Sequence, residues 1–109
     1  MSIIWITQET PHNFTSAEEF GEVVFVTNRD LHNHPNSLHN PEVLRQIQSK
    51  LTRFDPDNDF ILPVGSPYIS AMVFMMLGRA GVDKVRILRW SNRDKLYIPL
   101  YIHFSPPGA

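Results

Sequence analysis

The fold of this chain is decided by residues 59–81, DFILPVGSPYISAMVFMMLGRAG. The run before Gly65 is almost wholly apolar, which predicts a short strand covered on both faces. Gly65 permits a sharp turn, Ser66 is a good N-cap, and Pro67 suits the first helical position because its missing N–H would be unpaired there anyway. Residues 68–77 are apolar on every side, so we expect a helix with little solvent-facing surface.

The composition is that of one globular domain spanning residues 1–109, of which 42% are apolar and 19% charged. No apolar run approaches the roughly 18 residues that a membrane helix needs, and the N-terminus lacks a signal-peptide pattern. We therefore expect a cytoplasmic protein with no membrane contact. The absence of cysteine excludes disulfides, cysteine-bound zinc and thiol catalysis.

Strand and helix patterns alternate along the chain. Overlapping capping boxes after Thr15 predict one or two helical turns. Pro41 opens a helix with one apolar stripe, Leu44, Ile47, Leu51 and Phe54. The expected strands are residues 3–7, 22–27, 60–64, 84–90 and 96–104. This order predicts an α/β fold: a single compact domain with a mixed, mostly parallel sheet, Rossmann-like βαβ units and a C-terminal antiparallel hairpin.

The connections also predict an order of strands. Right-handed crossovers should make residues 22–27, 60–64 and 84–90 parallel neighbours, with 22–27 in the interior of the sheet. The last strand should run antiparallel beside 84–90, and Pro99 within it predicts a sheet edge. The Gly-x-Gly-x-x-Gly and Walker patterns are both missing, so the likeness to nucleotide-binding folds is a loose one.

Charge is distributed unevenly although the net charge is −1. Residues 1–65 contain nine acids and four bases, whereas residues 66–109 contain two acids and six bases, all between Arg79 and Lys95. This asymmetry predicts a locally positive surface. The alternative is that an edge hairpin stays soluble by carrying Lys and Arg.

The first candidate site is the turn at Gly65 and Ser66. A helix N-terminus presents backbone N–H groups to anions, and ligands of open α/β sheets bind beyond the carboxyl ends of the strands. Asn28, Arg29 and Asp30 follow another parallel strand and should lie at the same end of the sheet. The turn could hold a phosphate or nucleotide, or could serve structure alone, and Pro67 removes one donor.

The second candidate is a loop with three imidazoles, His32, His34 and His39. Histidines within ten residues can ligate zinc or a similar metal, but this spacing matches no recognised zinc signature. A solvated loop or a partner contact is the alternative interpretation. The acidic run 55–59 lacks the glycine and the closing glutamate of an EF-hand, so we expect no calcium site there.

The third candidate is one face of the terminal hairpin. Because side chains alternate along strands, the apolar residues of both strands should share one face. Bases and aromatics on the opposite face could bind a protein, a second copy in a homodimer, or nucleic acid, or could be covered by a helix. The residues of this hairpin face are Lys84, Arg86, Trp90, Tyr97, Tyr101 and His103.

Two segments carry a family resemblance. The sequence DFILPVGSP at residues 59–67 is followed by an apolar helix and by VRILRWSNRDKLYIP at residues 85–99. Residues 41–104 thereby resemble small, uncharacterised phage-encoded α/β proteins, in which acidic residues are expected where Ser66 and Ser91 stand. The resemblance implies a phage accessory protein that binds a host factor, and it transfers no catalytic residues.

These observations favour a small binding protein that is not an enzyme and needs no cofactor. Its partner would be a host protein or a second copy of the chain, bound in the host cytoplasm through the hairpin face and the histidine loop. The alternatives are nucleotide or phosphate binding at Gly65 and Ser66, and nucleic-acid binding through the bases and aromatics of the hairpin.

Overall fold

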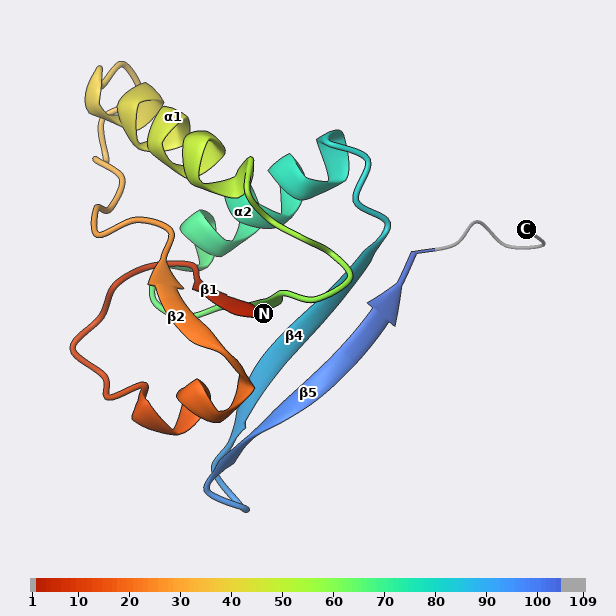
Figure 1. Cartoon of the computed structure of the whole chain (residues 1–109). Coiled ribbons are helices and arrows are strands. Elements are labelled where there is room, and N and C mark those ends of the chain that lie inside the picture. Colours follow the sequence, from red (N-terminus) through yellow and green to blue (C-terminus); the bar gives the residue numbers. More distant parts are fainter. Residues whose placement is uncertain (1, 105–109) are drawn as a thin grey trace.

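The computed structural model describes residues 2–104, which form one five-stranded sheet in the order β2-β1-β3-β4-β5 (Figure 1). The first four strands are parallel, and β5 runs antiparallel beside β4. The predicted α/β domain with a mixed sheet and a C-terminal hairpin is therefore confirmed. In chain order the elements are β1 (Ile3–Ile6), the 3-10 helix η1 (Thr15–Phe20), β2 (Glu22–Phe25), α1 (His39–Leu51), β3 (Phe60–Leu62), α2 (Pro67–Arg79), β4 (Lys84–Ser91) and β5 (Leu96–His103).

Two layers cover the sheet, and β1 shows how its side chains divide between them. Trp5 points into the core formed with α1 and α2, whereas Ile4 and Ile6 point into a second core beneath η1. Alternation along a strand sends neighbouring side chains to opposite faces, and all three of these are buried. The two helices pack on β1, β3 and the start of β4. They leave β5 uncovered (Figure 1).

The expected position of residues 22–27 is wrong. This segment forms the edge strand β2, and β1 lies between it and β3. The physical reason is burial: β1 is apolar on both faces and takes an interior position, whereas none of the residues of β2 is fully buried. The chain from β2 through α1 to β3 therefore crosses over β1 to reach the far side.

The turn from β3 into α2 forms as predicted. Gly65 has a φ of +79°, the Ser66 hydroxyl accepts the Tyr68 N–H, and Pro67 is the first residue of the helix. The expected lack of a solvent face is wrong, because Tyr68 and Met75 are exposed. Only one stripe of α2 meets α1 and the sheet, so apolar residues on its other side stay in solvent.

The other helices differ from expectation in detail. The buried stripe of α1 is Val43, Ile47 and Leu51, whereas Leu44 is exposed. The turns after Thr15 form η1, but its first N–H is accepted by the Asn13 side chain, and the predicted capping boxes do not form. No helix within residues 2–104 is long and apolar enough to cross a membrane.

Candidate functional site

Gln8, which the sequence analysis did not single out, fills the turn at Gly65 and Ser66. Its Oε1 accepts the Ser66 N–H at 2.6 Å, and its Nε2 donates to the Arg29 backbone oxygen at 2.9 Å. The Ser66 hydroxyl is also engaged, because it accepts the N–H of Tyr68. The backbone donors of this turn, the Ser66 and Tyr68 N–H groups, are therefore bonded within the chain.

Residues 28–30 do lie at the same sheet end, as their position after β2 predicts. Gln8 ties this segment to the Ser66 turn through the Arg29 carbonyl. Asn28, Arg29 and Asp30 are themselves exposed, and one Asp30 carboxylate oxygen accepts the next backbone N–H. Anion binding here stays a prediction, and a ligand would have to compete with Gln8 for the Ser66 N–H.

The histidine loop is held together by its own side chains. The rings of His32 and His39 stack with centroids 3.9 Å apart. His39 Nε2 lies 2.7 Å from the Asp30 backbone oxygen, and His32 Nδ1 lies 3.2 Å from the Ser37 hydroxyl. His34 Nδ1 accepts a backbone N–H two residues further on. Across residues 2–104, no three His, Asp or Glu side chains are placed to hold a metal ion.

The hairpin face forms as three cross-strand pairs. Their partners are Lys84 with His103, Arg86 with Tyr101, and Trp90 with Tyr97. The middle of the face is covered, since Tyr97 and Leu88 belong to the core beneath η1. Trp90 meets the buried Tyr97 ring edge-on at 5.0 Å between centroids and keeps a partly exposed surface. Tyr97 is thus a core residue, and Trp90 and Tyr101 are the exposed aromatics of this face.

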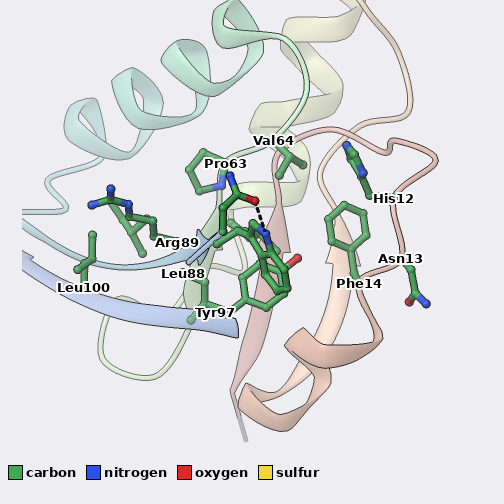
Figure 2. Close-up of a pocket in the computed structure, with 13 residues that line it drawn as sticks. His12, Asn13, Phe14, Pro63, Val64, Leu88, Arg89, Tyr97 and Leu100 are labelled. Carbon is green, nitrogen blue, oxygen red and sulfur yellow. Dashed lines mark hydrogen bonds between the residues drawn. The ribbon is translucent and has the colours of Figure 1, made fainter. Parts of the chain in front are cut away.

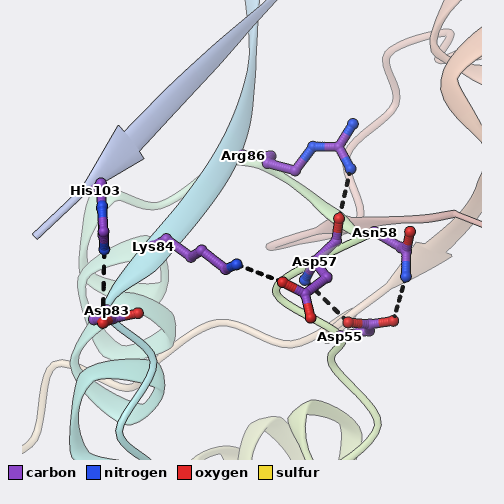
Figure 3. A network of polar contacts seen from close by, with 7 residues as sticks. All are labelled: Asp55, Asp57, Asn58, Asp83, Lys84, Arg86 and His103. Atoms are coloured by element: carbon purple, nitrogen blue, oxygen red, sulfur yellow. Dashed lines mark hydrogen bonds and ion pairs between the residues drawn. The ribbon is translucent and has the colours of Figure 1, made fainter.

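The bases at the amino end of β4 are paired with a neighbouring acidic turn (Figure 3). Lys84 Nζ lies 2.5 Å from an Asp57 carboxylate oxygen, and this hydrogen bond raises the pKa of Lys84. Arg86 donates to the Asp57 backbone oxygen and stacks its guanidinium 4.2 Å from the centre of the Phe60 ring. The Asn58 side-chain amide, followed by the Asp57 N–H, lowers the pKa of Asp55. Of the two strong bases on this face, Lys84 is therefore paired with a carboxylate, and Arg86 is bonded to a backbone oxygen.

The opposite face of β5 is apolar and uncovered. We expected the apolar side chains of both hairpin strands to share the core. This is so for Val85 of β4, which is buried beside α2. The expectation fails along β5, because the helices do not extend that far (Figure 1). Leu96, Ile102 and Phe104 are exposed there.

The outer edge of β5 is modified by a proline, as the sequence predicts. The Phe104 N–H donates to the Asp83 oxygen, so the backbone groups of these two residues point toward each other, between the two strands. In an antiparallel ladder every second residue pair does the same. Pro99 is out of phase with these pairs, and its nitrogen faces the outer edge, where it offers no N–H. A partner strand could not form a continuous ladder along β5, so contacts with side chains are favoured over strand addition.

A pocket of about 620 Å³ lies at the carboxyl end of β3 (Figure 2). One wall is the β1–η1 loop with His12 and Phe14, and another is the far half of the hairpin with Trp90 and Tyr97. The sequence analysis missed the loop wall. A signal was present, because the break at residues 11–13 follows an apolar strand, and loops after parallel strands gather at the ligand-binding edge of the sheet.

The buried position of Tyr97 predicts a loss of stability at alkaline pH. Burial raises the pKa of Tyr97 above the ordinary value of 10.0. The folded protein then keeps a proton that the unfolded chain releases, so stability is intact below that pH and falls as pH rises through it. We expect the unfolding temperature to be level up to about pH 9 and to drop by about pH 11. Tyr97→Phe should show a smaller drop than the exposed control Tyr101→Phe; equal drops would contradict the assignment.

Comparisons with known proteins identify the family. Neither the search of curated proteins nor the search of solved structures found a match. Residues 5–104 match the family described as Phage Pam3 gp32-like protein. The matched region contains all of η1, both helices and the whole hairpin. The chain therefore belongs to the Phage Pam3 gp32-like protein family.

Proposed function

We propose that this phage accessory protein binds a protein of the bacterial host through the β4–β5 hairpin and modulates or inhibits that protein without catalysis. The observation that carries the proposal is the exposure of apolar side chains on both faces of one edge strand. Tyr101 is 68% exposed on one face, and Ile102 and Phe104 are 36% and 62% exposed on the other. Exposed aromatic side chains of this kind are enriched at protein contact sites.

The two strong bases of the hairpin face favour a protein partner over nucleic acid. Nucleic-acid binding depends on Lys and Arg that are available to phosphates. Lys84 and Arg86 are instead occupied by the Asp57 side chain and backbone, and His103 lies 3.7 Å from an Asp83 oxygen. The exposed tyrosine lies beside these paired charges. Protein interfaces commonly have this arrangement, an aromatic centre with a polar rim.

Binding of a nucleotide or phosphate at Gly65 and Ser66 has weaker support. The Ser66 N–H and hydroxyl both have partners within the chain, and Gln8 occupies the space beside Gly65. Membership of a phage family supports a host protein as the target, and we expect the encounter in the cytoplasm of the infected cell.

The test begins with capture of partners from a lysate of the host, followed by affinity measurement with the purified partner. Phe104→Ala and Tyr101→Ala should each raise the Kd at least tenfold, because truncation of an interface aromatic commonly costs about 1.4 kcal/mol or more. Met75→Ala, an exposed apolar residue on α2, is the matched control and should leave the Kd unchanged.

Two results would overturn this proposal. The first is a partner that binds the two hairpin variants as tightly as it binds the natural protein. The second is a dimer in sedimentation experiments that both hairpin substitutions dissociate, which would assign the surface to a second copy of the chain.

A further inference from the structure

The pocket at the end of β3 owes its existence to Pro63. β4 has eight residues and β3 has three, and the two strands pair at Ile61 and Ile87. The next step of this parallel ladder would place Pro63 opposite Arg89, with the Pro63 nitrogen donating to the Leu88 oxygen. Proline has no N–H, so the ladder stops and the rest of β4 extends beyond β3.

Backbone groups of β4 consequently face the pocket. The Phe104–Asp83 hydrogen bond fixes which pairs point toward β5, and by alternation Leu88 and Trp90 point toward β3. The ladder contact at Ile61 uses the Leu88 N–H. The Leu88 oxygen and the Trp90 N–H are the next two backbone groups on this edge of β4. Among residues 2–104, no backbone hydrogen bond joins them to the segment after β3. One acceptor and one donor thus lie side by side on a strand edge.

The pocket walls supply two further features, a set of aromatic surfaces and a cation. Phe14, Trp90 and Tyr97 line the cavity, and its volume lies within the range of small-molecule sites. Arg89 also lines it, and its guanidinium has no hydrogen bond or ion pair with any residue that the structure describes. Its position beyond the carboxyl ends of parallel strands is the usual ligand site of open α/β sheets.

We propose that this pocket binds a nucleoside monophosphate. An adenine edge carries a donor and an acceptor side by side, which match the Leu88 oxygen and the Trp90 N–H. The planar base would lie against the aromatic walls, where base stacking contributes about 1–3 kcal/mol, and the phosphate would pair with Arg89. The site is separate from the Gly65 turn, and it does not depend on partner binding by Phe104 and Tyr101.

The first test is titration with AMP, followed by tryptophan fluorescence. The chain has two tryptophans, and Trp5 is buried, so a stacked base should change the emission of Trp90. We expect a saturable response to AMP, a weaker one to adenosine, and no tighter binding of a short oligoadenylate. The comparison with oligoadenylate distinguishes a site for a free nucleotide from a site for single-stranded nucleic acid. A response that persists in Trp90→Phe would place the ligand elsewhere and overturn the proposal.

Arg89→Ala should weaken AMP binding at least tenfold and leave adenosine binding unchanged. Arg93→Ala removes the same charge from the hairpin turn, outside the pocket lining, and should bind AMP normally. Both residues are exposed, so neither substitution should affect folding. Equal AMP affinities for these two variants would refute the role of Arg89.

Pro63→Ala gives the sharpest result, because it restores the missing N–H. The new donor can reach the Leu88 oxygen, extend the β3–β4 ladder and close the pocket, so AMP binding should be lost while the unfolding temperature is kept or raised. Pro99→Ala is the matched control, since its nitrogen faces the outer edge of β5. AMP binding by Pro63→Ala at the natural affinity, or no saturable AMP response in the natural protein, would overturn the proposal.

Discussion

Replacing Asp59 by alanine should lower the free energy of unfolding by about 3 kcal/mol or more, because three N–H groups lose their acceptor. The Asp59 carboxylate is 2% exposed. One of its oxygens accepts the Ile3 N–H at 3.0 Å, and the other accepts the Trp5 Nε1–H and the Asp55 N–H, each at 2.9 Å. Asp59 therefore joins the start of β1, the indole of Trp5 and the turn before β3.

Urea denaturation measures this effect directly. Asp57→Ala is the matched control, because it removes an exposed carboxylate from the same turn and should change stability by no more than about 1 kcal/mol. Asp59→Asn should fall between the two variants, since its amide has one acceptor oxygen in place of two. Similar denaturation midpoints for Asp59→Ala and Asp57→Ala would show that this buried carboxylate is dispensable.

Asp59 also illustrates a limit of sequence reasoning. The acidic run was interpretable as a calcium loop or a turn, and the missing glycine and glutamate excluded the first. Its actual role is to accept the indole N–H of a residue 54 positions away. A contact between segments so far apart produces no periodic pattern in the sequence, whereas a turn or a helix stripe can be recognised from neighbouring residues.

Local patterns predicted most of the elements for this reason. The β3–α2 unit follows from one apolar run and the sequence Gly65-Ser66-Pro67, and the edge position of β5 follows from Pro99. The order of β1 and β2 was not predictable in the same way, because both are short, apolar and β-branched. Their order depends on the connection from β2 to β3, which crosses over β1. That crossing depends on packing between residues far apart in the sequence.

The hairpin shows the same division between local and distant effects. Alternation alone assigned Arg86 and Tyr101 to one face, and the register pairs them. Alternation could not reveal that η1 covers Tyr97 or that Phe104 stays exposed beside α2. The pocket was hidden for a further reason: it depends on the absence of one N–H at Pro63 and on the length by which β4 exceeds β3.

Gly65→Ala should destabilise the protein almost as much as Asp59→Ala does, at a cost of about 2–4 kcal/mol. Gly65 has a φ of +79°, a backbone conformation that disfavours any side chain. An added Cβ would also lie 2.2 Å from Gln8 Oε1 and 3.1 Å from Gln8 Cβ. Gln8 cannot retreat without giving up its bonds to the Ser66 N–H and the Arg29 oxygen.

A double-mutant cycle separates the two contributions. Gln8→Ala removes the clash together with the hydrogen bonds, so adding Gly65→Ala to it should cost only the conformational part, about 1 kcal/mol. The difference between the two backgrounds is the coupling between Gly65 and Gln8. If Gly65→Ala costs the same in both backgrounds, the φ of Gly65 alone explains its requirement. A large difference would instead show that Gln8 fixes the turn from which α2 begins.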